Sequence, residues 1–168
     1  MHRIIFITLL FVSSNGICQS GFTDSTAVKN KRLAEKERLH RLWRIKQDTL
    51  DGVYIPKNLE DCFRELDLMM TEKNKEDFRT RSPIAYHMGL GRNLRNNWGL
   101  WSASRLREYF LDLGVTHPDN MSGIILDSYH RYLNGKDIDL DKQLSRYHLT
   151  PRPKPKRPKG YSLPPPHD

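Results

Sequence analysis

The sequence predicts an all-α fold, a small helical bundle of four to six helices with flexible basic arms. Between residues 51 and 149, apolar side chains recur at steps of three and four, and each run has helix start and stop residues. Runs of alternating β-branched residues, which would indicate strands, are absent. A chain of 168 residues has room for one domain of ordinary size. We therefore expect one helical domain over residues 51–149.

The first helix of this domain is expected to begin after Asn58, which can cap it with Asp61 three residues on. Its apolar face would consist of Leu59, Cys62, Phe63, Leu66, Met69 and Met70. Cys62 on this face is expected to be a buried thiol that acts as a small hydrophobe. A turn over residues 74–79, presenting Phe78, is expected to follow.

Ser82 and Pro83 predict the start of the next helix, because serine caps and proline is tolerated in the first turn. The expected packed face runs through Ile84, His87, Met88, Gly91 and Leu94 towards Trp98. Gly91 would let a neighbouring backbone or a large ring approach closely, with a tryptophan as the expected neighbour.

The stretch RNNWGLWSASRLREYF, residues 95–110, predicts a corner between two helices. Gly99 can end a helix in the left-handed conformation, so Trp98 and Trp101 would lie on either side of it. Ser102 or Ser104 would cap the following helix. The face of that helix would be Leu106, Tyr109, Phe110 and Leu113, with Gly114 as its stop.

Two further helices are expected towards the end of the domain. Pro118 forces His117 to be extended, so that Asp119 or Asn120 can begin a helix that Gly135 ends. Its stripe would be Met121, Ile124, Ile125, Ser128, Tyr129, Tyr132 and Leu133. A short last helix would start at Asp137 or Asp139 and include Leu140, Leu144 and Tyr147.

The net charge of +8 belongs to the arms and not to the domain. Residues 51–149 carry a net charge of −1, whereas residues 21–50 and residues 150–168 carry +4 each. The first arm is expected to be partly helical: either a solvated helix that docks by its second half, or an amphipathic segment on an anionic membrane. Its stripe would be Leu39, Leu42, Trp43 and Leu50. The second arm has seven prolines and is expected to be an extended, disordered tail.

Residues 1–20 are expected to be a secretory signal peptide. Arg3 precedes an apolar run from Ile4 to Val12, which is far shorter than the roughly 20 residues that span a bilayer. Cleavage after Cys18 or Ser20 would export the chain to the periplasm or the exterior. The alternative is a lipoprotein acylated on Cys18, which Ile17 disfavours because lipoprotein processing uses a small residue there.

Three segments resemble a bacterial domain of unknown function that occurs in Bacteroidota proteins. They are YIPKNLEDCFRELD, RNNWGLWSASRLREYF and HPDNMSGIILDSYHRYLNG, and the resemblance covers about residues 53–147. It implies a domain boundary and a bacterial source. It implies no activity, substrate or catalytic residue.

The preferred candidate for a ligand site is the cationic and amide surface beside the double indole. Arginine forks next to exposed rings can bind a carboxylate, a phosphate or a sugar by paired hydrogen bonds and stacking. The candidate residues are Arg92, Arg95, Asn96, Asn97, Trp98, Trp101 and Arg105. In the alternative interpretation, the asparagines satisfy backbone groups and the arginines pair with Glu108 and Asp112.

A catalytic alternative would use Asp127, His130 and Glu108 as acid and base. No G-x-S-x-G elbow, phosphate-binding glycine loop, paired-cysteine spacing or H-x-x-x-H pair occurs, so neither a cofactor nor a metal is expected. The neutral domain also argues against specific nucleic-acid binding.

The sequence therefore predicts an exported, non-enzymatic binding module. Its expected partner is a protein or an anionic ligand at the corner, with the basic arms in peripheral contact with an anionic membrane or envelope polymer. The alternatives are a hydrolase-like enzyme and an inhibitor or immunity-type protein.

Overall fold

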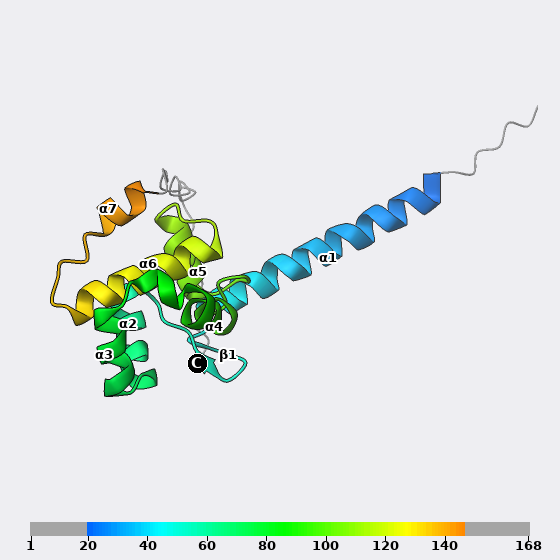
Figure 1. Cartoon of the computed structure of the whole chain (residues 1–168). Coiled ribbons are helices and arrows are strands. Elements are labelled where there is room, and N and C mark those ends of the chain that lie inside the picture. Colours follow the sequence, from blue (N-terminus) through cyan, green and yellow to red (C-terminus); the bar gives the residue numbers. More distant parts are fainter. Residues whose placement is uncertain (1–19, 147–168) are drawn as a thin grey trace, which may run out of the picture. The chain divides into compact units, whose positions relative to one another are not determined.

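The computed structural model describes residues 20–146, so the predicted signal peptide, except its last residue Ser20, and the proline-rich tail lie outside the described residues. Within this range there are seven α-helices, a 3-10 helix, a π-helix and a two-stranded sheet, which confirms the all-α prediction (Figure 1). The chain divides into two compact units after Arg38, and each is described by itself.

The first unit contributes most of α1 (Ser20–Lys46), the helix expected in the first arm. From residue 25 to residue 38 every side chain is exposed, including Val28 and Leu33. Arg38 pairs with Glu35 one turn away at 2.8 Å. This part of α1 is thus helical and exposed along its length, supported by local pairs of modest strength.

The second unit begins with the last turns of α1. Leu39, Leu42 and Trp43 are exposed, so the helical part of the predicted stripe does not pack on the domain. Its fourth member, Leu50, is buried but belongs to a strand and not to the helix. Polar contacts anchor this end of α1 instead: Arg41 pairs with Glu108 at 3.2 Å, and Arg44 donates to the Ala103 carbonyl at 3.2 Å.

A hairpin follows α1, where no strand was predicted. Its strands β1 (Thr49–Leu50) and β2 (Val53–Tyr54) are antiparallel. Asp51 and Gly52 form the turn with φ values of 53° and 80°. Asp-Gly is a favoured pair where both turn residues need a positive φ, so this hairpin had a local signal.

Helix α2 (Leu59–Met69) begins as predicted, with the Asn58 side chain accepting a hydrogen bond from the Asp61 amide at 2.9 Å. Its inner face is buried except for the half-exposed Met69. Cys62 is fully buried, and burial raises the pKa of its thiol, helped by the charges of Asp61 and Glu65.

Residues 74–79 belong to a helix, so the prediction of a turn there is wrong. Helix α3 (Glu72–Thr80) starts at Thr71, whose hydroxyl accepts from the Asn74 amide at 3.3 Å. Phe78 is fully buried and packs against Tyr86 and Tyr129, with ring centroids 4.5 and 5.5 Å apart. Phe78 is the one apolar residue among the nine of α3, so the sequence has no apolar periodicity there that could predict a helix.

The helix expected from Ser82 is divided into three pieces: the 3-10 helix η1 (Pro83–Tyr86), the π-helix η2 (His87–Gly91) and α4 (Arg92–Asn97). The predicted face is wrong at Ile84 and Met88, which are 74% and 75% exposed. The changes of helical pitch rotate the face, because a π turn holds more residues than an α turn.

Gly91 is buried as expected, but its close neighbours are not a tryptophan. A Cβ on Gly91 would lie 3.2 Å from Arg95 Nη1 and 3.3 Å from Leu126 Cδ1.

The remaining helices are α5 (Arg105–Asp112), α6 (Pro118–Leu133) and α7 (Leu140–Ser145). Helix α6 is the centre of the second unit and contacts α2, α3, α4, α5, η1 and η2 (Figure 1). The helix is capped by the side chain of His117, and not by Asp119 or Asn120, because His117 Nδ1 accepts from the Asp119 amide at 3.2 Å.

Helix α7 begins at Asp139, one of the two expected starts, which has a left-handed conformation with φ of 51°. Its buried Gln143 donates to the Ser128 hydroxyl of α6 at 3.0 Å. Tyr147, expected in this helix, lies outside the described residues.

Candidate functional site

The corner between α4 and α5 forms around Gly99, as predicted. Gly99 has a φ of 66°, and a Cβ there would lie 2.8 Å from the Ser104 Cβ. The Ser104 hydroxyl donates to the Trp98 carbonyl at 3.1 Å and accepts from the Arg107 amide at 3.1 Å. Ser104 therefore caps α5 and ties it to the end of α4, so the corner is fixed locally.

The two indoles of the corner lie in opposite environments. Trp98 is 2% exposed and belongs to the core, whereas Trp101 is 57% exposed. Trp101 meets the ring of His117 edge to face, with centroids 6.0 Å apart. This contact orients an indole that still offers most of its surface to a partner.

Arg95 lies under the corner, 7% exposed at its side chain, and joins α4 to α6. Its Nε is 3.0 Å from Asp119 Oδ1, and its Nη1 donates to the Ser122 hydroxyl at 2.8 Å. His87 and His117 are also near this carboxylate, with nitrogen–oxygen distances of 3.9 and 3.6 Å. A buried cation needs such partners, so Arg95 is engaged within the fold.

Arg105 is also held by the protein. Its Nε donates to the Ile55 carbonyl at 2.6 Å, and its guanidinium carbon lies 4.9 Å from the centre of the Tyr54 ring. Its Nη2 is buried and has no hydrogen-bond partner within residues 20–146. Arg95 thus pairs with Asp119, and Glu108 pairs with Arg41 at 3.2 Å.

Beside the corner is a groove of about 340 Å³, which we call the corner groove. The exposed amides of Asn96 and Asn97 line it, together with residues from the end of α1, the hairpin and the loop after Gly99. The polar members of its lining are Arg44, Asp51, Asn96, Asn97 and Ser102. Arg44 and Asp51 have opposite charges and lie 3.9 Å apart, so the groove is polar without a strong net charge.

Of the seven predicted ligand-binding residues, some are buried and stabilise the corner, whereas others are exposed and can contact a ligand. Burial places Arg95 and Trp98 inside the domain, and Arg105 is partly buried against the hairpin. Arg92, Asn96, Asn97 and Trp101 are exposed. Arg44 and Asp51 were missed because they come from distant parts of the sequence, and the Asp-Gly turn was the one local signal that a wall of the groove begins there.

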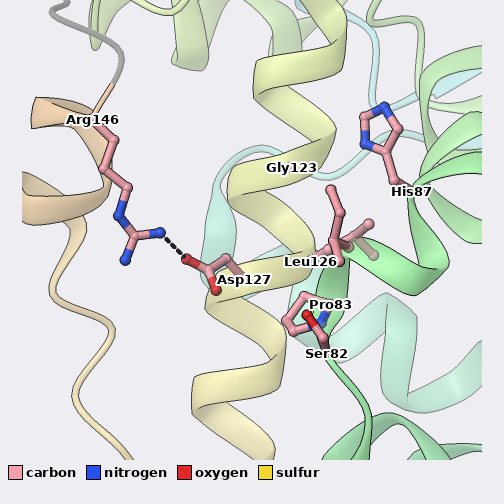
Figure 2. A pocket seen from close by; sticks show the side chains of 8 residues that line it. Ser82, Pro83, His87, Gly123, Leu126, Asp127 and Arg146 are labelled. Carbon is pink, nitrogen blue, oxygen red and sulfur yellow. Dashed lines mark hydrogen bonds and ion pairs between the residues drawn. The ribbon is translucent and has the colours of Figure 1, made fainter.

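The residues of the catalytic alternative have partners on different elements. Asp127 pairs with Arg146 at 3.1 Å (Figure 2), His130 Nε2 is 3.0 Å from the Arg79 carbonyl, and Glu108 pairs with Arg41. These contacts give no arrangement of a base next to a nucleophile. Within residues 20–146, no group of three histidine, cysteine, aspartate or glutamate side chains is placed to hold a metal ion.

A buried carboxylate at the start of α2, that of Asp61, accepts from several donors. Asp61 is 1% exposed and accepts from the Tyr54 hydroxyl at 3.0 Å and the Lys57 amide at 2.9 Å, and it pairs with Arg64. Burial alone would raise the pKa of Asp61, but these donors together lower it below the usual value. Asp61 therefore orients Tyr54, the ring on which Arg105 lies.

The fold and the site define a small helical domain with a polar groove at a helix corner. Residues 55–133 match the model of a family described as a domain of unknown function, DUF6794, so the predicted resemblance to an uncharacterised domain is confirmed. No curated protein and no solved structure matches the chain. In the described part of the chain, no helix has both the length and the apolar character to span a membrane.

Proposed function

We propose that this protein is an exported, non-enzymatic binding module that holds a polypeptide partner at the corner groove and Trp101. The observation that carries the proposal is an indole that is 57% exposed, on a corner fixed by buried contacts. Tryptophan is enriched among the residues that dominate protein interfaces. An exposed ring on a rigid support loses little conformational freedom on binding, which favours affinity.

The lining of the corner groove fits a polypeptide better than a simple anion. Asn96 and Asn97 each offer a carbonyl acceptor and two amide donors, and Ser102 offers a hydroxyl. A peptide backbone presents the same alternation of donors and acceptors. The charges of Arg44 and Asp51 largely cancel, so they select against neither sign.

An anionic ligand, the other partner that the sequence suggests, has less support. Two of its three expected cations are engaged: Arg95 with Asp119 and Ser122, and Arg105 with the Ile55 carbonyl. Arg92 remains exposed. A single exposed guanidinium gives only weak binding of an anion in water.

Export and the basic arms belong to the same proposal. The apolar run at residues 4–12 supports export, and the charge of +4 on each arm supports peripheral attachment to an anionic surface. Taken over its whole length, α1 has no one-sided apolar face, and its exposed apolar patch is short, at Leu39, Leu42 and Trp43, which favours electrostatic attachment over insertion into lipid.

Photo-crosslinking tests the corner groove in cells that make the protein. Benzoylphenylalanine replaces Asn97 in one variant and the exposed Lys136, after α6, in a control. We expect one discrete protein adduct from position 97 and none from position 136. Excess wild-type protein should compete the adduct away, and Trp101→Ala protein should compete roughly 30-fold less well, because central tryptophans contribute about 2 kcal/mol or more. Equal competition by the two proteins would refute the corner groove as the binding site.

Vesicle sedimentation tests the attachment separately. The full mature chain should bind phosphatidylglycerol vesicles at low salt and should not bind phosphatidylcholine vesicles. Replacing Lys29, Lys31 and Arg32 of α1 and the lysines of the tail with glutamine should remove most of this binding, because each basic residue contributes about 1 kcal/mol at such a surface. Unchanged binding would refute the attachment and leave the corner groove untouched.

A further inference from the structure

A second cavity lies between α6 and the segment formed by η1 and η2, and it is independent of the corner groove. Its volume is about 260 Å³. Figure 2 shows Ser82, Pro83 and His87 on one side, and Arg146 of the chain after α7 on the other. Helix α6 contributes Leu126, Asp127 and Gly123, and the glycine leaves the helix backbone bare of a side chain.

One side of this cavity carries a positive and a negative group next to each other. Arg146 Nη1 is 3.1 Å from Asp127 Oδ2, and the two side chains are 53% and 29% exposed. Figure 2 shows the Arg146 guanidinium, at the end of α7, facing the Asp127 carboxylate of α6. A pair with this exposure is only weakly held, so both groups are accessible to a ligand.

The opposite side of the cavity is held in place by contacts of His87 with α4 and α6. The His87 carbonyl accepts from Arg95 at 3.4 Å, and His87 Nε2 is 3.9 Å from Asp119. Gly91 allows η2 to pack tightly against Leu126 of α6. A π-helix is rare and occurs often at functional sites, and this one places His87 at the cavity.

We propose that this cavity binds a small zwitterion that carries an ammonium and a carboxylate, such as a free α-amino acid. The Asp127 carboxylate accepts the hydrogen bonds of the ammonium, and the Arg146 guanidinium donates to the ligand carboxylate. The apolar carbons of Pro83 and Leu126 contact the body of the ligand. Ser82 and His87 face its far end and accept or donate hydrogen bonds there.

The charge arrangement explains the choice of ligand. A simple anion would be attracted by Arg146 but repelled by Asp127. A simple cation would be attracted by Asp127 but repelled by Arg146. A zwitterion satisfies both groups at once and replaces one exposed ion pair by two charge-assisted contacts.

Thermal unfolding and titration calorimetry with the full mature chain test the proposal. The probes are the twenty free amino acids at about 10 mM, where a ligand of millimolar affinity stabilises the fold measurably. Each hit is compared with its decarboxylated amine and its deaminated acid. We expect at least one amino acid to raise the unfolding midpoint, while the matched amine and acid bind at least tenfold more weakly.

Two variants and a control decide which groups bind. Asp127→Asn and Arg146→Gln should each weaken binding at least tenfold, because each removes a charge contact of the ligand. Lys142→Gln, in α7 one turn before Arg146 and 68% exposed, should bind like the wild type. Circular dichroism confirms that the variants are folded. The proposal is overturned if no amino acid binds, if an amine or acid binds as well as its zwitterion, or if Asp127→Asn binds with unchanged affinity.

Discussion

Trp98 and Trp101 are three residues apart in one corner, and the structure uses them differently. Trp98 is 2% exposed and packs in the core that α6 organises, whereas Trp101 is 57% exposed and touches His117. The same contrast holds for Arg95, which is buried, and Arg92, which is exposed. One sequence motif thus contains both the buried residues that stabilise the corner and the exposed residues that can bind a partner. Substitutions of the two kinds should therefore affect stability and binding separately.

The largest expected effect comes from the buried indole. Trp98→Ala should lower the free energy of unfolding by about 3–5 kcal/mol, because it removes a large core side chain and leaves a cavity. Trp101→Ala should change it by less than about 0.5 kcal/mol. Urea denaturation followed by circular dichroism measures both free energies of unfolding. Equal decreases in the two variants would contradict the assignment of Trp98 to the core and Trp101 to the surface.

The turn of the corner gives the next effect. Gly99→Ala should cost about 2–3 kcal/mol, because φ is 66° and the new Cβ would lie 2.8 Å from the Ser104 Cβ. Gly52→Ala is the matched control: φ is 80° but no atom lies within 4 Å of the added Cβ, so only the backbone strain of about 1 kcal/mol remains. The difference between the two midpoints in urea measures the crowding at the corner.

Asp119→Ala tests the ion pair beneath the surface. It leaves the buried Arg95 without its carboxylate and should cost about 2 kcal/mol, less than a fully buried pair because Asp119 is 42% exposed. Asp112→Ala, at an exposed position of α5, should change stability by less than about 0.5 kcal/mol. A loss of similar size in the two variants would mean that Arg95 does not depend on Asp119.

The smallest effect is a dependence on acid pH. The pKa of Asp61 is lowered in the folded state from 3.8, so the folded protein binds this proton less readily than the unfolded chain. The stabilisation is therefore complete above the unfolded pKa and is lost as pH falls through the lower folded pKa. Asp61→Asn should flatten this part of the stability profile between pH 5 and pH 2, roughly the range in which such a carboxylate titrates. An unchanged slope would assign the acid sensitivity to other groups.

Local features were predictable from the sequence because they depend on neighbouring residues. Asn58 caps α2, Gly99 turns the chain and Ser104 caps α5, each through contacts within six residues. The Asp-Gly hairpin could have been predicted by the same reasoning. The helix α3 could not, because its stability depends on Phe78 packing against Tyr86 and on α6.

Which candidate residues are buried and which are exposed could not be predicted from neighbouring residues in the sequence. Arg95 and Arg92 look alike in the sequence, and only the distant Asp119 and Ser122 decide that Arg95 is buried. The pitch change at η2 also rotates α4, so Ile84 and Met88 leave the packed face while Leu94 stays on it. A prediction based on a constant 3.6 residues per turn does not include such a change of pitch.

Fluorescence of single-tryptophan proteins tests the central division most directly. One protein keeps Trp98 and carries phenylalanine at positions 43 and 101, and the other keeps Trp101 and carries phenylalanine at positions 43 and 98. We predict blue-shifted emission with little acrylamide quenching for Trp98, and red-shifted emission with strong quenching for Trp101. Equal quenching of the two indoles in folded proteins would contradict the account.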